Sequence, residues 1–295
     1  MYLICMKGYY NMDLTSPRTI RNIQEQFGFT FKKGLGQNFL TARNILEEIV
    51  DAAEIESGVI EVGPGFGVLT SELAQNSDKV VTIEIDERLI EVIDYTLAEY
   101  DNVKIINEDI LKLDLKKVID DEFKGEKVSI AANLPYYITT PIITKLLEEK
   151  LPIKNIVVMV QKEVAERMSA KPSTKDYGAI TVLCQYYTEP SIVANVPASL
   201  FVPPPKVDSA VLKLKVLDKP SVEVKDEGVF FRVVKAAFSQ RRKTLLNCLS
   251  ANFPIPKDEI STLLESIGIA PSRRGETLSL EEFANIADTL LQKIK

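Results

Sequence analysis

Short runs of apolar, mostly β-branched residues alternate with longer polar–apolar stretches between residues 58 and 162. Strand-like runs cover residues 59–62, 80–85, 103–106, 128–132 and 156–160. Residues 89–100 and 141–150 are typical of helices. Strands that are apolar throughout are buried on both faces, and strand–helix alternation indicates a parallel sheet with helices on either side. The pattern therefore predicts an α/β fold.

The pattern changes after residue 190. Two further strand-like runs, residues 191–196 and 210–217, flank the proline-rich stretch FVPPPK at 201–206. That gap is too short for a helix, so we expect the two strands to pair antiparallel at an edge of the sheet. Beyond a boundary near residues 218–225 the strand pattern ends, and four helices are expected. They cover residues 227–238, 243–253, 257–267 and 279–293.

The N-terminal region is expected to be simpler. Residues 1–15 have the character of a disordered extension and lack a signal-peptide h-region and cleavage site. A helix over residues 16–27 is favoured by Ser16 as a cap, Pro17 in the first turn and Gly28 after the end. Thr41 is expected to cap a second helix. We therefore expect three segments, 1–15, 16–218 and 219–295.

Composition removes several kinds of chemistry. The 295 residues include no histidine, which excludes Ser-His-Asp catalysis, His-ligated zinc and imidazole proton shuttles. The three cysteines, Cys5, Cys184 and Cys248, form no Cys-x-x-Cys pair, so we expect no metal site and no disulfide framework. No apolar run approaches the roughly 18–20 residues that span a bilayer. A cytoplasmic protein, without membrane contact, is expected.

The net charge of −6 conceals an uneven distribution. Residues 1–45 carry a net +4, residues 46–130 a net −14 and residues 151–250 a net +6. Local positive patches, rather than the sum, determine contact with phosphates. Nucleic acid therefore remains a candidate partner, although helix surfaces that differ in charge would give the same pattern.

A glycine-rich turn follows the first strand of the alternating region. The turn reads EVGPGFG at residues 61–67, so its spacing is Gly-x-Gly-x-Gly instead of the Gly-x-Gly-x-x-Gly of dinucleotide-binding folds. Pro64 removes an N–H that a pyrophosphate would use. Glu61 places an acid on the turn, which suits a ligand with an ammonium group and no phosphate. S-adenosylmethionine is such a ligand.

Two more acids lie where strands end. Glu84 ends the second strand, 21 residues after Gly63, where a carboxylate can accept hydrogen bonds from both ribose hydroxyls. Asp109 follows the third strand and can accept from an adenine amine. Ligands of open α/β sheets bind at carboxyl ends of strands, so three acids there indicate one nucleoside site.

The segment NLPYY, residues 133–137, follows the fourth strand. It resembles the active-site motif of methyltransferases that act on exocyclic amines of bases. The Asn133 amide oxygen and the Leu134 carbonyl can each accept one hydrogen from adenine N6, which frees the nitrogen lone pair for attack on a sulfonium methyl. Pro135 fixes the backbone, and Tyr136 offers a ring on which a flipped base can stack. A proline turn with packed tyrosines is the structural alternative.

With these residues in place, the chain resembles the bacterial small-subunit rRNA adenine N6,N6-dimethyltransferases, the kasugamycin-sensitivity family. The resemblance extends from about Ser16 over nearly the whole chain. Its motifs are LGQNFL at 35–40, the turn at 61–70, EID at 84–86, NEDIL at 107–111, NLPYY at 133–137, QKEV at 161–164, FVPPPKVDS at 201–209 and FSQRRKT at 238–244. The last two are the most specific.

The resemblance implies a Rossmann-like class I methyltransferase sheet, mostly parallel with the last strand antiparallel, and a small all-helical C-terminal domain that recognises rRNA. It implies four methyl transfers from S-adenosylmethionine to two adjacent adenosines in a hairpin near the 3′ end of 16S rRNA, within the small ribosomal subunit or its precursor. Phe201 would be a second stacking partner for the target base, or else a core residue. We expect a monomer.

The candidate site residues fall into three groups. The catalytic group is Asn133, Leu134, Pro135, Tyr136 and Phe201. The cofactor-binding group is Gln37, Asn38, Leu40, Glu61, Gly63, Gly65, Glu84, Ile85, Asp109, Ile110 and Asn133. The candidate phosphate contacts are Lys32, Lys33, Arg241, Arg242 and Lys243, for which a solvated helix face is the alternative.

Three other functions remain open. The large-subunit rRNA adenine methyltransferases that confer macrolide resistance share the fold and the Asn-x-Pro-Tyr type of motif, but we do not expect them to carry the motifs at 201–209 and 238–244. A non-catalytic assembly checkpoint or transcription factor could use the same fold. A nicotinamide-dependent oxidoreductase is disfavoured by the turn spacing and Pro64.

Overall fold

The computed structural model describes residues 12–28 and 38–294, which form two compact units. The first unit contains residues up to 162 and residues 193–213, and the second contains residues 163–192 and 214–294. This division differs from a single boundary near residue 218, because the segment 163–192 groups with the C-terminal helices. The predicted extension 1–15 is described only from Met12, and there Leu14 is already buried in the core.

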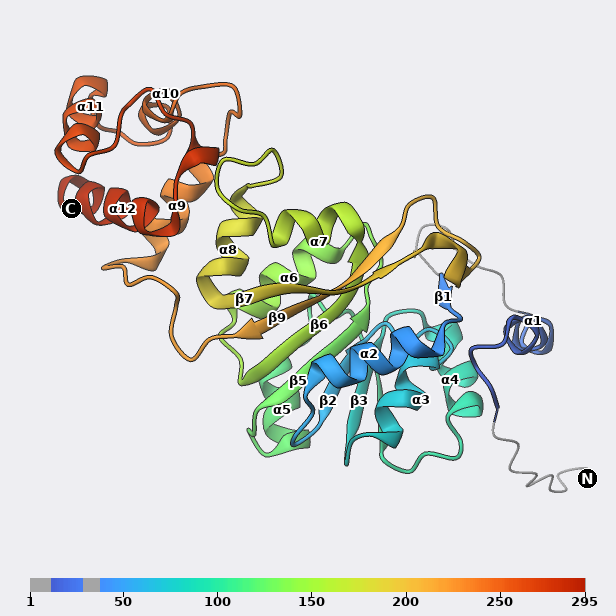
Figure 1. Cartoon of the computed structure of the whole chain (residues 1–295). Helices are drawn as coiled ribbons and strands as arrows, with labels where there is room; N and C mark the ends of the chain where they lie inside the picture. The colour runs from blue at the N-terminus through green and yellow to red at the C-terminus, as the bar shows by residue number, and fades with distance from the viewer. Residues whose placement is uncertain (1–11, 29–37, 295) are drawn as a thin grey trace, which may run out of the picture. The chain divides into compact units, whose positions relative to one another are not determined.

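A seven-stranded sheet of order β4-β3-β2-β5-β6-β9-β7 is the framework of the fold (Figure 1). The pairs β2–β3, β3–β4, β2–β5 and β5–β6 are parallel. Strands β7 and β9 are neighbours at one edge and run in opposite directions, as expected. The strands are β2 (Val59–Val62), β3 (Val80–Glu84), β4 (Val103–Asn107), β5 (Val128–Asn133), β6 (Ile153–Gln161), β7 (Thr188–Val196) and β9 (Ser209–Val216).

The order of the strands explains where the helices lie. The chain steps outward through β2, β3 and β4 and then returns to β5 and β6, so right-handed crossovers place α3 and α4 on one face and α5 and α6 on the other. The helices of this unit are α1 (Pro17–Gln26), α2 (Arg43–Ala53), α3 (Val68–Gln75), α4 (Ile90–Thr96), α5 (Leu115–Phe123) and α6 (Thr139–Glu148), with 3-10 turns η2 (Glu87–Leu89) and η3 (Ala198–Leu200). Strands β2 and β3 are buried throughout, but β4 is half-exposed because it is the edge strand, contrary to the prediction.

The second unit is mostly helical, although it also contains the parts of β7 and β9 at residues 188–192 and 214–216. Its predicted helices after residue 226 are confirmed as α9 (Glu227–Ala237), α10 (Leu245–Ser250), α11 (Lys257–Ser266) and α12 (Leu280–Ile294), with a 3-10 turn η4 (Gly275–Thr277). Two further helices were not predicted, α7 (Lys162–Met168) and α8 (Ala179–Tyr187). Phe230 and Tyr186, from α9 and α8, stack in its core with ring centroids 4.8 Å apart. Within the described residues, no helix is long and apolar enough to cross a membrane.

A two-stranded ribbon joins the start of α2 to a distant part of the chain. Strand β1 (Phe39–Leu40) pairs antiparallel with β8 (Phe201–Val202), with Leu40 opposite Phe201. The N-cap of α2 is Ala42, and the Thr41 hydroxyl donates instead to the Leu200 carbonyl at 2.8 Å. The prediction of Thr41 as the cap was wrong, because this long-range contact takes its side chain.

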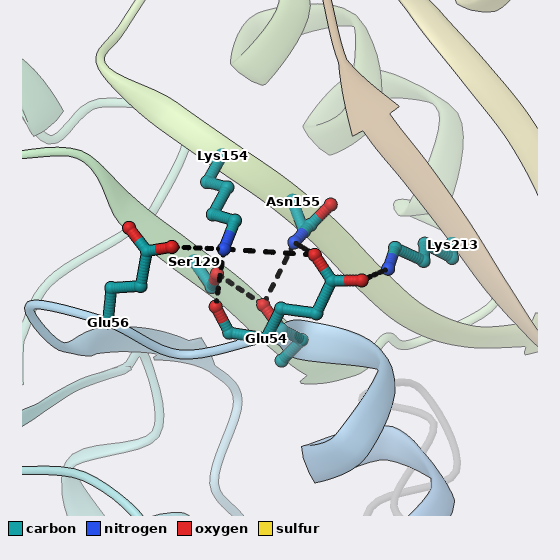
Figure 2. Close-up of polar contacts among 7 residues, drawn as sticks. Glu54, Glu56, Ser129, Lys154, Asn155 and Lys213 are labelled. Carbon is teal, nitrogen blue, oxygen red and sulfur yellow. Dashed lines mark hydrogen bonds and ion pairs between the residues drawn. The ribbon is translucent and has the colours of Figure 1, made fainter.

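The other end of α2 is held by side chains of the sheet (Figure 2). The Ala53 carbonyl accepts from Ser129 Oγ at 2.6 Å and from Asn155 Nδ2 at 3.0 Å. Glu54 follows the helix in the left-handed region, and its carboxylate accepts from Lys213 Nζ at 2.6 Å. Lys154 Nζ donates to the Glu54 carbonyl at 3.2 Å. These donors satisfy carbonyls that a helix end leaves without partners.

Candidate active site

A cavity opens at the carboxyl ends of β2, β3 and β5. Strands β2 and β5 are neighbours, and the chain leaves them in opposite directions across the sheet, which makes this point the topological switch where open α/β sheets bind ligands. The cavity encloses about 1040 Å³ counting its open mouth, at the upper end of the range for small-molecule sites. Its lining includes Asn38, Leu40, Glu61, Gly63, Gly65, Glu84, Ile85, Asp109, Ile110, Asn133 and Pro135.

The structure thus brings together the described members of the predicted cofactor-binding group. They come from the segment before α2, the turn after β2, the end of β3 and the loop after β4. Gln37, Lys32 and Lys33 lie outside the described residues. The assigned roles of all these residues stay predictions, which the arrangement of the cavity supports.

The three glycines of the turn after β2 have positive φ angles of 71°, 61° and 83° at Gly63, Gly65 and Gly67. Their surroundings differ. A Cβ on Gly65 would lie 2.7 Å from the Phe39 ring, and a Cβ on Gly67 would press on Leu97, whereas a Cβ on Gly63 would meet nothing within 4 Å. Gly65 and Gly67 therefore allow close packing, and Gly63 leaves its backbone open to a ligand.

Two buried carboxylates give the cavity its electrostatic character. Burial and, to a smaller extent, the nearby Glu84 carboxylate raise the pKa of Glu61 to about 8, although the hydrogen bond that Thr70 Oγ1 donates at 2.5 Å opposes the shift. Burial also raises the pKa of Glu84 to about 7, although its carboxylate accepts from the Asp86 N–H at 2.7 Å. None of the described groups that shift these pKa values is a cation. A ligand with positive charge and hydroxyl donors would supply the missing partners.

Asp109 and Ile85 line the cavity at the place where the sequence predicts a nucleoside. The Asp109 carboxylate accepts from the Leu111 N–H at 3.0 Å, which holds the loop after β4, and one of its oxygens lies 3.9 Å from Lys112 Nζ. Ile85 lines the cavity with 55% of its surface exposed. An exposed aliphatic side chain beside a carboxylate offers a flat apolar contact and a hydrogen-bond acceptor, as a purine requires.

Asn133 ends β5 at the cavity. Its Nδ2 donates to the Asn38 carbonyl at 3.0 Å, across 95 positions of sequence. The bond uses the donor end of the amide, so Oδ1 is the end that can accept from a substrate amine. Leu134 is buried and its N–H donates to the Met159 carbonyl at 3.1 Å, which fixes the backbone beside Asn133. Pro135 lines the cavity.

The aromatic residues differ in how far they are buried, and Phe201 follows the alternative of a core residue. Phe201 has 2% of its surface exposed and packs in the core, because β8 pairs with β1; it offers no free face for stacking in this arrangement. Tyr136 is half-buried, and its hydroxyl is 2.8 Å from Ser209 Oγ. Tyr137, to which the sequence analysis assigned no chemistry, lines the cavity and is 59% exposed. The only sequence signal for a role of Tyr137 is its position directly after the motif residues 133–136.

The basic candidates Arg241, Arg242 and Lys243 belong to the second unit and are exposed. Arg241 is already engaged: its guanidinium donates to the Lys175 carbonyl, and its Nε lies 3.5 Å from the Glu276 carboxylate. The three side chains therefore differ in how freely they can meet phosphates.

Comparisons with known proteins agree with this geometry. A model of the ribosomal RNA adenine dimethylase family matches residues 28–292. The ribosomal RNA small subunit methyltransferase A of Bacillus mycoides (strain KBAB4) is 54% identical over 285 residues, which cover 95% of this chain and 98% of that protein. The protein of the same name from Bacillus cereus (strain B4264) has the same identity and coverage.

Solved structures give the same answer for the fold. A dimethyladenosine transferase from Plasmodium falciparum aligns with a TM-score of 0.70 and 30% identity over 84% of this chain and 95% of that chain. The 23S rRNA methyltransferase ErmE aligns with a TM-score of 0.65 and 27% identity over 86% of this chain and 100% of that chain.

Proposed function

Because the chain belongs to the ribosomal RNA adenine dimethylase family, we propose that it transfers methyl groups from S-adenosylmethionine to N6 of two adjacent adenosines near the 3′ end of 16S rRNA. The observation that carries the proposal is the position of Asn133. Its amide lies at the switch point of the sheet, oriented by the Asn38 carbonyl, beside a cavity with two buried carboxylates.

The residues of the cavity fit S-adenosylmethionine. No cation is among the described groups that shift the pKa values of Glu61 and Glu84. The sulfonium and ammonium groups of this cofactor would supply such a positive partner. Glu84 would accept from the ribose hydroxyls, Asp109 from the adenine amine, and the open backbone at Gly63 would border the methionine part. When bound, the cofactor supplies an electrophilic methyl group.

Asn133 and Leu134 act on the amine of the target base. The N6 lone pair is delocalised into the adenine ring and attacks poorly. Asn133 Oδ1 and the Leu134 carbonyl each accept one N6 hydrogen, which draws the nitrogen toward tetrahedral geometry and frees the lone pair. Preorganised acceptors of this kind need no reorganisation during the reaction. The methylated amine then loses a proton to water, so the absence of histidine is no obstacle.

Contact with the rRNA is assigned to exposed basic residues. Arg241, Arg242 and Lys243 lie in the segment FSQRRKT of the second unit. We propose residues 219–295 of this unit as the rRNA-recognition region. Phosphate contacts fix the orientation of an RNA without reading its sequence.

Methylation of 23S rRNA is the second candidate, favoured by the likeness to ErmE at 27% identity. One experiment separates the two. Small subunits and large-subunit rRNA from cells lacking these modifications would receive label from S-adenosylmethionine, and the labelled nucleosides would be identified by mass spectrometry. Dimethyladenosine in small-subunit rRNA alone supports the proposal, and label in large-subunit rRNA supports the second candidate.

A further inference from the structure

Two consecutive tyrosines follow the end of β5 in different surroundings. The Ile138 N–H donates to the Pro135 carbonyl at 3.1 Å, so Tyr136 and Tyr137 are the two central residues of a tight turn. Tyr136 is half-buried with its hydroxyl beside Ser209. Tyr137 keeps 59% of its surface exposed while it lines the cavity. The turn therefore buries the Tyr136 ring in part and leaves the Tyr137 ring exposed.

We propose that Tyr137 is the stacking platform for the RNA base next to the target adenosine. The inference rests on the proposed function, in which the substrate presents two adjacent adenosines. When one adenosine reaches Asn133, the other must remain at the mouth of the cavity. The second base has then lost its stacking on the first. An exposed aromatic ring there replaces the stacking that this base has lost, with a gain of about 1–3 kcal/mol per base.

The other candidate rings and exposed apolar side chains discussed above do not fit this role. Phe39, the other aromatic ring in the lining, is buried and stacks on Phe66 with ring centroids 4.2 Å apart. Phe201 is buried in the core. Ile85 is exposed but aliphatic, and it borders the cofactor side, after Glu84. Tyr137 is the aromatic ring of the described lining that an incoming base can reach.

The test is a double-mutant cycle between the ring and the base. Wild type, Tyr137→Ala and Tyr137→Phe would be titrated with a 16S-type hairpin that contains both adenosines, and with hairpins in which one adenosine is abasic. In an abasic hairpin the remaining adenosine is the only target, so the missing base is the neighbour. Tyr95→Ala is the matched control, because Tyr95 is 44% exposed and contacts Phe27 instead of lining the cavity.

We expect Tyr137→Ala to weaken binding of the intact hairpin about 5- to 150-fold, the equivalent of one stacked base. Tyr137→Phe and Tyr95→Ala should bind it like wild type. On the abasic hairpins Tyr137→Ala and wild type should bind alike, because the partner of the ring is already absent.

Equal weakening of intact and abasic hairpins would overturn the proposal, since the ring would then contact another part of the RNA. A raised Kd for S-adenosylhomocysteine with unchanged RNA affinity would overturn it too, and would assign Tyr137 to the cofactor. Methyl transfer by the wild type to small subunits is measured separately. A failure of that reaction contradicts the proposed function, whereas the binding cycle reports on Tyr137 alone.

Discussion

The side-chain amide of Asn133 donates to the backbone carbonyl of Asn38, with 3.0 Å between nitrogen and oxygen. The bond connects the end of β5 to the residue before β1, and both residues line the cavity. The segment that leads into α2 therefore determines which end of the Asn133 amide, which we propose to be catalytic, can face a substrate.

Replacement of Asn133 should separate catalysis from cofactor binding. We expect Asn133→Ala to lower the rate of methyl transfer at least about 100-fold, the scale of one lost preorganised hydrogen-bond partner, while the cofactor Kd stays within severalfold. Asn133→Asp keeps an acceptor but cannot donate to Asn38, so its rate should lie between those of wild type and Asn133→Ala. Single-turnover rates and calorimetric Kd values measure both effects. A cofactor Kd that rises in step with the loss of rate would contradict the assigned role.

Cofactor affinity should depend on pH through Glu84. Its pKa of about 7 means that the carboxylate is mostly protonated at pH 6 and mostly ionised at pH 8. If the ionised form accepts from the ribose hydroxyls, affinity for S-adenosylhomocysteine should rise up to about tenfold over this range. Glu84→Gln should bind more weakly and lose this dependence. The ligand's own titration is common to both proteins, so identical pH profiles would place the ribose contact elsewhere.

Glu61 should make the ligand-free protein less stable as the pH rises. Its folded-state pKa of about 8 lies above the ordinary glutamate value, so between about pH 4.5 and 8 the folded protein holds a proton that the unfolded chain has released. Stability from this group is complete below pH 4.5 and is lost as the pH rises to 8. We expect Glu61→Gln to flatten this decline and to be more stable than wild type at pH 8 by about 1 kcal/mol or more.

Urea denaturation at pH 5, 6.5 and 8 measures this effect. Glu126→Gln, which replaces an exposed glutamate of the same unit, is the control and should leave the pH dependence unchanged. A parallel decline of wild type and Glu61→Gln would show that other groups cause it.

The sequence predicted those features that depend on local pattern. The predicted strand at residues 59–62 is β2, with the same bounds. The glycine turn that follows it leads into α3, as predicted, and lines the cavity. The acids at the strand ends lie around that cavity because parallel strands bring their carboxyl ends to one edge.

Features that depend on distant partners were out of reach. The burial of Phe201 follows from pairing with Leu40, which is 161 positions away. The half-exposed β4 follows from its place at the edge, which depends on the order of the whole sheet. Tyr136 and Tyr137 are the same residue type, and only the turn directs one inward and one outward.

The two arginines of the segment FSQRRKT should respond differently to removal. Arg242 is exposed, so Arg242→Ala should weaken rRNA binding and reduce the slope of log K against log salt by about 1 without loss of stability. Arg241 holds the Lys175 carbonyl and lies near Glu276, so Arg241→Ala should also loosen the segment before α8. Binding over a salt series and hydrogen exchange in residues 171–177 measure the two effects. An unchanged salt slope in Arg242→Ala would mean that this side chain does not meet phosphate.

Glu54 combines an unfavourable backbone conformation with favourable ion pairs, and substitutions can separate the two. Its φ of 46° is in the left-handed region, where glycine is unstrained, and its carboxylate accepts from Lys213 and lies 3.7 Å from Lys154 Nζ. Glu54→Ala loses the ion pairs and keeps the strain, so we expect a loss of about 1 kcal/mol in the free energy of unfolding. Glu54→Gly loses the same pairs but relieves the strain, and should be more stable than Glu54→Ala by about 1 kcal/mol. Lys213→Met removes one of the two pairs without touching the backbone, so it should lose less stability than Glu54→Ala. Urea titration of the three variants tests the ranking, and equal stability of the alanine and glycine variants would show that the left-handed conformation carries no cost here.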